Sequence, residues 1–339
     1  MKPCQATLFR PACLFTILLV LLWHQPMPTE AASPLQKVVI ATGIQPKPVM
    51  ELAQREGFFA AQGLDVTLKT YVMGKEGLER MLAGECDFAT PAGGPVAHYA
   101  LTRRDFRIIA SLYHHNNITQ IVARKDRGIL TPKDLRGKRL GVAKNTAPHF
   151  FADLLLNKHG IRSDEVTWVF REGSEVLALL TNDEADAIST LSQPALTLTK
   201  NLGRDKTVVF SEPGICHNNV VLVARTDTLS SRPEITDRLL RALIKTEEYL
   251  TAHPDALSSL IARDTQLGEA DARLIASDYY FNIGLPHVLL LGMEDFARWS
   301  VENGFTKPTM PTNFLAIIDP APLRRIAPAR VNLEKAGGR

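Results

Sequence analysis

The sequence has little net charge, few cysteines and no long apolar run beyond its N-terminal region. The formal net charge of the 339 residues is +3, and no long block of Lys or Arg appears, which argues against nucleic acid or a membrane surface as the partner. The sequence also lacks a phosphate-binding glycine loop and the G-x-S-x-G pattern of serine hydrolases. We therefore expect neither a polyphosphate ligand nor serine-hydrolase chemistry.

The N-terminal region has the pattern of a secretory signal peptide. Lys2 and Arg10 precede the apolar run Leu14–Trp23, and the small residues Thr29 and Ala31 mark a cleavage site. An uncleaved membrane anchor is the alternative, but the run is shorter than the ~20 residues needed to cross a bilayer. We predict a signal peptide over residues 1–31 and a mature protein exported to the periplasm.

Two of the four cysteines, Cys4 and Cys13, fall in the predicted signal peptide, so that Cys86 and Cys216 remain. Export permits a disulfide between them, but each lies beside a predicted strand in a different half of the chain. We expect two separate buried thiols. Neither has an evident base partner, so cysteine-dependent catalysis is not expected.

Histidines are the other candidates for reactive chemistry. A zinc ion could in principle be held by members of one group: His98, His114, His115, His149 and His217. No pair has the spacing of a metal motif, and in a strand the adjacent His114 and His115 would point to opposite faces. We predict no metal, no cofactor and no enzymatic activity, with a metal-dependent protein or an enzyme using an interlobe cleft as the alternative of another class.

The chain after the signal peptide shows the same α/β pattern twice. In the first copy, a strand over Lys37–Thr42 is followed by a helix over Val49–Gln62 and an alternating strand over Leu64–Val72. In the second copy, a strand over Lys138–Ala143 is followed by a helix over Pro148–His159. The order of elements predicts two α/β half-domains of the same topology.

Landmark residues support this repeat. Lys37 and Lys138 are 101 residues apart, Gly74 and Gly173 are 99 apart, Asp87 and Asp186 are 99 apart, and Arg124 and Arg225 are 101 apart. We expect strand-like crossings near Arg124 and Arg225 to join the two halves as a hinge. Asp87 and Asp186 each precede a strand, and we expect them to bond turn amides rather than a ligand.

The stretch Met81–Gly94 predicts one wall of a ligand cleft. It ends a helix, turns at Gly84, forms a short strand, and finishes in small residues that begin a new helix. Bare N–H groups at such a helix start bind ligands outside the carboxyl ends of the strands. Leu180–Pro194 is the counterpart, about 99 residues later. We expect the two loops to face each other, with Ser192 and Gln193 choosing among ligands.

Six strand-end loops are predicted to line the cleft between the halves. They are rich in amides, hydroxyls and small residues and poor in cations, since only Lys47 and Lys144 are near. An anion would be held mainly by backbone N–H groups. The candidate ligand-binding residues are Gly43, Ile44, Gln45, Ala92, Gly93, Gly94, His115, Asn116, Asn145, Thr146, His149, Ser192, Gln193, His217 and Asn218. Gly93 and Gly94 could equally serve a tight turn, and Asn116 could simply form one.

The C-terminal third has a different pattern. Helical periodicity dominates Pro233–Gly304, and we expect no new sheet to begin there, only helices that pack back on one half. Residues 319–339 are rich in Arg and Pro, and we expect them to form a flexible tail.

Several segments resemble a known family. Glu51–Val66 is similar to the "a-x-x-x-G-y/f-f-x-x-x-G-l-x-V" segment of the sulfonate, taurine and nitrate periplasmic binding proteins and of the related thiamine-pyrimidine binders. Leu82–Ala89 resembles their "l-x-x-G-x-x-D-x-a" segment, and Leu135–Val142 resembles "dLkGKkigv". Asp186-Ala187 with Gln193-Pro194 resembles a further loop of the family, although Gln193 stands where an acidic residue is often found.

The resemblance implies a type II periplasmic binding protein with two α/β lobes, a hinge, and C-terminal helices on lobe 1. Lobe 1 would comprise residues 35–124 and 226–318, and lobe 2 residues 125–225. Such a protein delivers a small solute to an ABC permease and ATPase complex, and we expect a monomer. A sulfonate-like, taurine-like or nitrate-like ligand is implied, with a thiamine-precursor pyrimidine or other heterocycle as the alternative. Gln193 removes a charge that would suit an amine-bearing ligand.

Overall fold

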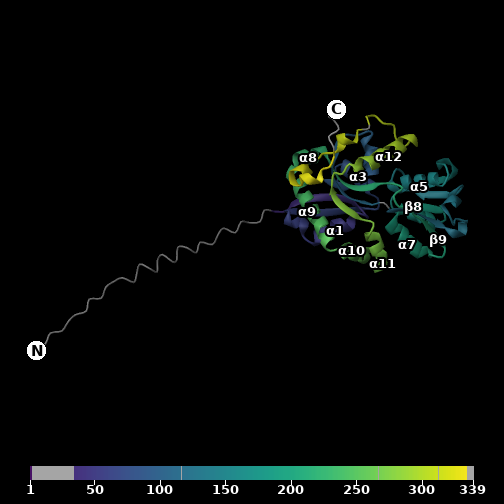
Figure 1. Ribbon diagram of the computed structural model, residues 1–339, viewed down its shortest axis with the longest axis horizontal. Coiled ribbons are helices and arrows are strands. Elements are labelled where there is room, and N and C mark those ends of the chain that lie inside the picture. Colours follow the sequence, from purple (N-terminus) through teal and green to yellow (C-terminus); the bar gives the residue numbers. More distant parts are fainter. Residues whose placement is uncertain (2–33, 116, 266, 312, 334–339) are drawn as a thin grey trace. The chain divides into compact units, whose positions relative to one another are not determined.

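The computed structural model describes residue 1 and residues 34–115, 117–265, 267–311 and 313–333. The predicted signal peptide lies almost wholly outside these residues and stays a prediction. None of the helices among the described residues is long and apolar enough to span a bilayer. Leu35–Arg339 forms one compact unit. Its elements divide into two halves, with α1 and α9 in one and α5, β8 and β9 in the other (Figure 1).

The first sheet has six strands in the order β11-β4-β10-β3-β1-β2. Its strands are β1 (Gln36–Gly43), β2 (Leu64–Tyr71), β3 (Phe88–Thr90), β4 (Phe106–His115), β10 (Asn218–Arg225) and β11 (Tyr280–Gly284). β1 pairs in parallel with both β2 and β3, and its β-branched Val38 and Ile40 are fully buried. We call this sheet and the helices packed on it lobe 1.

The second sheet has five strands in the order β7-β6-β8-β5-β9. Its strands are β5 (Thr119–Arg124), β6 (Arg139–Val142), β7 (Thr167–Phe170), β8 (Ala187–Leu191) and β9 (Thr207–Phe210). β6 pairs in parallel with β7 and β8, as β1 does with β2 and β3. This sheet with its helices is lobe 2, and the repeat expected from the landmark residues is therefore present in the fold.

The two lobes exchange one strand, and this corrects the predicted hinge. β5 pairs antiparallel with β8 and β9 in the second sheet, whereas β10 pairs antiparallel with β3 and β4 in the first. The chain therefore crosses between sheets before β5 and before β10, and not near Arg124 and Arg225, which end these strands. The predicted boundaries placed both strands in the wrong lobe, because sequence order does not show which sheet an antiparallel strand joins.

Seven helices of the described residues belong to the repeated pattern, and all but α2, which comes after α1, follow a strand. Lobe 1 contains α1 (Lys47–Arg55), α2 (Phe58–Ala61), α3 (Gly74–Leu82) and α4 (Gly93–Ala100), and lobe 2 contains α5 (Ala147–Lys158), α6 (Glu175–Thr181) and α7 (Ser192–Leu202). Three short 3₁₀ turns also lie in lobe 2: η1 (Lys125–Arg127), η2 (Pro132–Leu135) and η3 (Ser163–Glu165). Pro48 and Pro148 occupy the first turns of α1 and α5, where the missing N–H has no helical partner to lose.

The C-terminal third packs on lobe 1. Its elements are α8 (Thr226–Ser231), α9 (Pro233–Ala252), α10 (Asp255–Thr265), α11 (Glu269–Ala276), α12 (Val288–Glu302), η4 (Phe314–Ile317), α13 (Ala321–Ile326) and η5 (Pro328–Arg330). α9 packs against α1 and α2, and α12 packs against α4. The expectation of helices alone is wrong, because β11 extends the first sheet along β4. Its five residues are too few to show a strand period.

The predicted flexible tail is also wrong for the part that the structure describes. Arg325 pairs with Asp237 of α9 at 2.7 Å, and Arg330 pairs with Glu247 of the same helix at 2.8 Å. Val331 forms a β-bridge with Leu285. Acidic partners on α9 therefore fix the arginines that made this segment look like a tail. Residues 334–339 lie outside the described residues.

Cys86 and Cys216 are both free, as expected. Cys86 is buried in the core of lobe 1, and Cys216 is half-buried. Burial raises the pKa of both thiols, that of Cys216 to about 11, so that neither is a thiolate at neutral pH.

Candidate functional site

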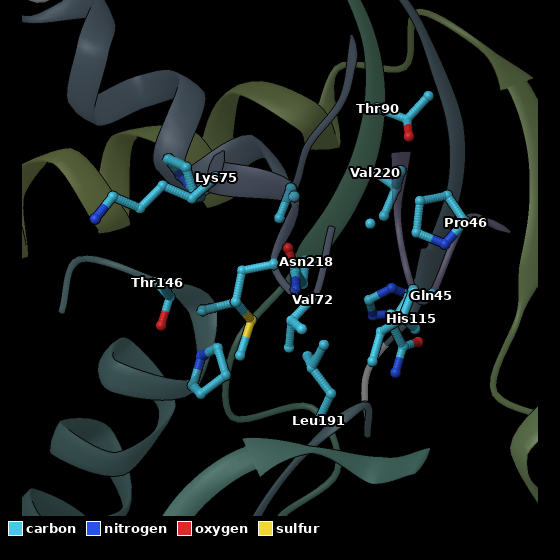
Figure 2. Close-up of a pocket in the computed structure, with 18 residues that line it drawn as sticks. Gln45, Pro46, Val72, Lys75, Thr90, His115, Thr146, Leu191, Asn218 and Val220 are labelled. Atoms are coloured by element: carbon cyan, nitrogen blue, oxygen red, sulfur yellow. The ribbon is translucent and has the colours of Figure 1, made fainter. Parts of the chain in front are cut away.

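A cavity lies between the two lobes at the carboxyl ends of their strands. Lobe 1 supplies residues from the ends of β1 to β4 and from the start of β10, and lobe 2 supplies the starts of α5 and α7. The lining residues are Gly43, Ile44, Gln45, Pro46, Val72, Met73, Gly74, Lys75, Thr90, Ala92, Pro95, His115, Thr146, Ala147, Pro148, Leu191, Asn218 and Val220 (Figure 2). Strand ends facing each other across two lobes are the usual place for a ligand in such folds.

Five helices begin at this cavity. The residues at or next to their first turns line it: Pro46 for α1, Gly74 for α3, Ala92 for α4, Ala147 for α5 and Leu191 for α7. At all five starts the N-cap residue makes no side-chain capping bond. Some first-turn N–H groups donate to backbone oxygens, as Ser192 does to Ile118, but the remaining N–H groups and the positive ends of the helix dipoles favour a negative charge in the cavity.

Thr146 shows how a capping side chain is turned away from its own helix. It is the N-cap of α5, but its Oγ1 donates to the carbonyl oxygen of Ala143 at 2.7 Å. The Ala147 N–H is left without a side-chain acceptor, which keeps it available to a ligand, whereas Pro148 has no N–H and the His149 N–H donates to the carbonyl oxygen of Thr146 at 3.1 Å.

No Asp or Glu occurs among the described residues that line the cavity, and one Lys does. The Nζ of this Lys75 donates to the carbonyl oxygen of Lys144 at 3.2 Å and lies 3.6 Å from Glu172. Lys75 therefore bridges the lobes and is partly neutralised. Lys47 and Lys144, the cations expected near the cleft, do not belong to the described lining, so backbone N–H groups at the helix starts are the main donors left for an anion.

Two polar side chains at one side of the cavity have atoms without partners. Gln45 and His115 are only 5% and 3% exposed, and within the described residues Gln45 Nε2 and both ring nitrogens of His115 find no hydrogen-bond partner. Burial lowers the pKa of His115 to about 3, and nearby His114 adds to this, so the ring is neutral at physiological pH. These atoms are available to a ligand or to water.

A cluster of aromatic side chains joins the lobes at a second place. Lobe 1 contributes Phe296, Trp299 and Phe305, and lobe 2 contributes His149, Phe150, Trp168 and Phe170. Trp299 Nε1 donates to Asp153 Oδ2 at 2.9 Å. Lys144 Nζ lies 5.3 Å from the ring centre of Phe305 and 5.5 Å from that of Phe170, within cation–π range. This interlobe aromatic cluster holds the lobes together in the conformation described.

Comparison with known proteins assigns the chain to a family. The family described as NMT1/THI5 like matches residues 49–257, which is more than half of the chain. The chain belongs to the NMT1/THI5-like family. Its architecture is that of a type II periplasmic binding protein: two α/β lobes, two crossings between them and C-terminal helices on lobe 1.

Relatives of this NMT1/THI5-like protein include binding proteins. It is 22% identical over 238 residues to a Brucella abortus (strain 2308) protein named as a binding protein, covering 66% of this chain and 69% of the relative. The structure of the alkanesulfonate-binding protein SsuA from Xanthomonas axonopodis pv. citri, bound to MOPS, matches with a TM-score of 0.70. That match has 14% identity and covers 88% of this chain and 99% of the other.

The fold is also used by an enzyme. The desulfurization enzyme DSZB matches with a TM-score of 0.61 and 14% identity, covering 87% of this chain and 99% of the other. Likeness at this identity shows the fold alone. The function of this NMT1/THI5-like protein therefore has to be argued from its own cavity.

Seven of the fifteen predicted ligand-binding residues line the cavity. They are Gly43, Ile44, Gln45, Ala92, His115, Thr146 and Asn218. Asn145 and Ser192 are chain neighbours of lining residues, and each has a buried side-chain oxygen without a partner among the described residues. Asn116 lies outside the described residues.

Gly93 and Gly94 do not line the cavity. A Cβ built on Gly94 would lie 2.5 Å from Cδ2 of Phe296, and one on Gly93 would lie 3.5 Å from Met293 Cγ. Both contact α12, so these glycines allow α4 and α12 to pack closely. The sequence suggested that these glycines allow a ligand to approach or form a tight turn. In the structure they instead allow close helix packing.

His149, Gln193 and His217 also lie outside the lining. His149 is buried in the interlobe aromatic cluster, where burial and then Lys144 lower its pKa to about 3. His217 is exposed and lies in a groove formed with α5 and α12. Gln193 is half-buried in the first turn of α7 but does not reach the cavity. The sequence shows that these residues lie next to strand ends, but it does not show in which direction their side chains point.

Eleven lining residues were not among the fifteen named candidates. They are Pro46, Val72, Met73, Gly74, Lys75, Thr90, Pro95, Ala147, Pro148, Leu191 and Val220. Three of them, Ala147, Pro148 and Leu191, nevertheless lie within the loops that the sequence predicts to line the cleft. One signal could have found part of this set: Gly74 begins a helix directly after a strand, the same pattern that selected Gly93. The histidine cluster considered for zinc does not assemble, and no group of three His, Cys, Asp or Glu side chains comes together among the described residues.

Proposed function

We propose that this protein is a periplasmic solute receptor of an ABC importer that binds a small organic anion of the sulfonate type in the interlobe cavity. The observation that carries the proposal is the meeting of five helix N-termini without side-chain caps at a cavity whose described lining contains no carboxylate. A sulfonate offers three oxygen acceptors and one negative charge, which such a site can satisfy with backbone N–H groups.

Closure of the lobes would couple binding to transport. The anion would touch helix starts from both lobes, and Lys75 and the interlobe aromatic cluster add contacts between them. A ligand that contacts both lobes shifts the open–closed equilibrium toward the closed form. We propose that an ABC permease and ATPase recognise that form, and that the receptor acts as a monomer.

We propose binding without catalysis. In the described lining, no hydroxyl group is hydrogen-bonded to a histidine, and both thiols lie outside the cavity with raised pKa values. The lining therefore offers no activated nucleophile. Turnover of a bound sulfonate or sulfinate by the purified protein would contradict this part of the proposal.

The first test is ligand binding by the mature chain, residues 32–339. We expect alkanesulfonates to raise the melting temperature, since a ligand at 100 times its Kd adds about 2.7 kcal/mol of stability. Taurine, nitrate and thiamine-precursor pyrimidines complete the panel. A pyrimidine is the second candidate, because neutral Gln45 and His115 can pair with ring nitrogens. A response to pyrimidines alone would replace the sulfonate by the heterocycle.

A pair of variants at Ala92 tests the anion site itself. Ala92 is the N-cap of α4, is half-buried and lines the cavity. Asp and Asn are both good N-cap residues, so neither should weaken the helix. We expect Ala92→Asp to reduce sulfonate affinity at least 100-fold by charge repulsion, and Ala92→Asn to change it by only a few-fold. Equal affinities of the two variants would contradict an anion site.

A further inference from the structure

The cavity has a side with uncharged polar side chains from lobe 1, and this side lies apart from the helix starts of lobe 2. Gln45 and His115 lie together on one side of the pocket, and Thr146 lies on the other (Figure 2). Three atoms on the first side are without partners in the described residues: Gln45 Nε2, His115 Nδ1 and His115 Nε2. A buried polar atom that stays unpaired destabilises the folded protein, so a ligand group that pairs with it gains affinity.

Tyr279 fixes the orientation of this side. Its buried hydroxyl lies 2.8 Å from the backbone oxygen of Gln45 and 3.2 Å from Gln45 Oε1, across 234 residues of sequence. The ring of Tyr279 also packs at 6.2 Å from the His115 ring, and Tyr113 packs at 5.4 Å from it. Gln45 and His115 are therefore held in place before a ligand arrives, which lowers the entropy cost of binding.

A positive group on the ligand would find no counter-charge here. No carboxylate belongs to the described lining, and the neighbouring side chains Tyr113, Tyr279 and His115 are neutral. Asp278, next to Tyr279 in the chain, is half-buried and lies outside the lining, and burial raises its pKa. An ammonium taken from water into such a place keeps its desolvation cost without an ion pair. A hydroxyl, amide or ring nitrogen, in contrast, can both donate to and accept from the free atoms.

We infer that the cavity selects organic anions whose second functional group is a neutral hydrogen-bonding group, and that it discriminates against zwitterions such as taurine. This inference rests on the proposed function and names the ligand class within it. Gln45 and His115 are the specificity-determining residues, and Tyr279 is a positioning residue that acts through Gln45.

Three sulfonates with the same head group and a two-carbon chain test the inference by calorimetry on the mature protein. Isethionate ends in a hydroxyl, ethanesulfonate in a methyl group and taurine in an ammonium group. We expect isethionate to bind about tenfold more tightly than ethanesulfonate, since one buried hydrogen bond contributes on that order. We expect taurine to bind at least about tenfold more weakly than ethanesulfonate, because its charge is unpaired.

Variants of the two polar residues assign the effect. His115→Phe keeps the ring shape in aromatic surroundings but removes both nitrogens, so the preference for isethionate over ethanesulfonate should fall to about twofold or less, while ethanesulfonate affinity is kept. Gln45→Glu supplies a carboxylate at the same place and should make taurine the tightest of the three. His287→Phe, at an exposed position outside the lining, is the matched control and should leave all three affinities unchanged.

The outcomes separate the inference from the proposed function. If the native protein binds taurine as tightly as isethionate, the inference is overturned while the anion receptor stands. If His115→Phe keeps the full preference for isethionate at an unchanged melting temperature, the assignment to His115 is overturned. If none of the three sulfonates binds and Ala92→Asp behaves like Ala92→Asn toward every anion tested, the proposed function itself fails.

Discussion

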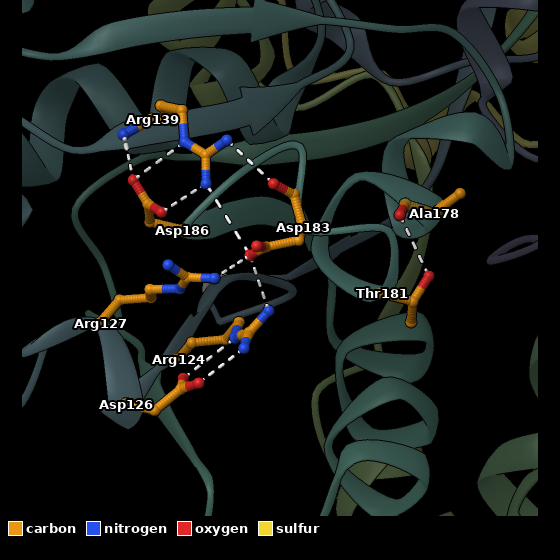
Figure 3. A network of polar contacts seen from close by, with 8 residues as sticks. All are labelled: Arg124, Asp126, Arg127, Arg139, Ala178, Thr181, Asp183 and Asp186. Carbon is orange, nitrogen blue, oxygen red and sulfur yellow. Dashed lines mark hydrogen bonds and ion pairs between the residues drawn. The ribbon is translucent and has the colours of Figure 1, made fainter.

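The two lobes build the same helix-to-strand turn with different chemistry. In lobe 1 the turn after α3 is made at Gly84, where φ is 87°, and Arg225 donates to the carbonyl oxygen of Met81 at 3.0 Å. In lobe 2 the turn after α6 is made at Asp183, where φ is 62°, and Arg124 donates to Asp183 Oδ1 at 2.9 Å (Figure 3). Gly84 and Asp183 are 99 residues apart, like the other landmarks of the repeat.

One contact is the same in both lobes. Asp87 Oδ2 accepts a hydrogen bond from the Val39 backbone at 2.7 Å, and Asp186 Oδ2 accepts one from the Arg139 backbone at 2.9 Å. Each carboxylate also pairs with an arginine: Asp87 with Arg232 at 2.9 Å and Asp186 with Arg139 at 2.8 Å. The sequence predicted that these two residues bond turn amides, and this is wrong in one respect: the amides belong to the neighbouring strands β1 and β6.

The two turns differ in how they accommodate a residue with a positive φ. Gly84 has no Cβ and adopts a positive φ at little cost. An Asp in the same conformation costs about 1 kcal/mol, and at Asp183 this is offset by contacts with Arg124, Arg127 and Arg139. The turn of lobe 1 therefore depends on backbone geometry, and that of lobe 2 depends on charge.

The largest expected loss of stability comes from removing the carboxylate that occupies the same place in each lobe, Asp87 in lobe 1 and Asp186 in lobe 2. Asp186→Ala leaves the Arg139 amide unpaired and its guanidinium short of partners, and should lower the free energy of unfolding by about 2–3 kcal/mol. Asp87→Ala should cost about 1–2 kcal/mol, because the Asp87 side chain is 25% exposed against 12% for Asp186. Urea unfolding of both variants measures the difference. A larger loss at Asp87 would contradict the greater dependence of lobe 2 on charge.

Gly84→Ala should have the next largest effect. An added Cβ is strained at φ 87° and would lie 3.2 Å from Arg225 Nη1, so we expect a loss of about 2 kcal/mol. Gly57→Ala is the matched control, because Gly57 has φ 72° with no atom within 4 Å of a built Cβ, and should cost about 1 kcal/mol. Equal losses for the two variants would show that Arg225 does not constrain the turn.

Acid should act on lobe 2 through Asp186. Burial tends to raise the pKa of this carboxyl, but the Arg139 side chain and backbone N–H together outweigh burial and lower it. A lowered folded pKa contributes stability above the unfolded value of about 3.9, and that stability is lost as pH falls through the folded pKa. Urea midpoints from pH 6 to pH 2.5 should therefore fall less steeply for Asp186→Asn than for the native chain. If the urea midpoints of the two proteins fell equally with pH, Asp186 would not contribute to the loss of stability in acid.

The smallest expected change in stability comes from a substitution that gives the turn of lobe 2 the glycine found in the turn of lobe 1. Asp183→Gly removes the strain of the left-handed Asp and also its half-exposed ion pairs, which are worth about 0–1 kcal/mol. The change at low salt should be within about 0.5 kcal/mol, and at 1 M salt the variant should become more stable than the native chain, since salt screens the lost pairs. Asp183→Asn keeps the left-handed tolerance without the charge and serves as control. A variant that is clearly less stable at 1 M salt would refute the comparison.

Much of the fold could be predicted because it depends on local sequence patterns. Two runs of β-branched residues, glycines after helices and an Asp before a strand recur at nearly constant spacing, and each has a local physical cause. The site could be predicted in part, since strand ends that begin helices lie at one edge of a sheet. This reasoning found Gly43, Ala92 and Thr146, but not Lys75 or Val72.

The rest depended on which distant segments meet. No local pattern shows that β5 and β10 exchange sheets, because an antiparallel strand has the same period in either sheet. Likewise, Gly94 is explained by Phe296, and the orientation of Gln45 by Tyr279. The members of these pairs are 202 and 234 residues apart in the sequence and meet only when the C-terminal segment packs on lobe 1.

The sequence by itself therefore determined the repeated α/β pattern and the place of the cleft, because helix starts and strand ends are local features. Only the tertiary structure decided which polar side chains face the cavity and that no acidic one does among the described residues. That outcome depends on packing between lobes and on the C-terminal segment, whose contacts are set by shape and burial over long sequence separations.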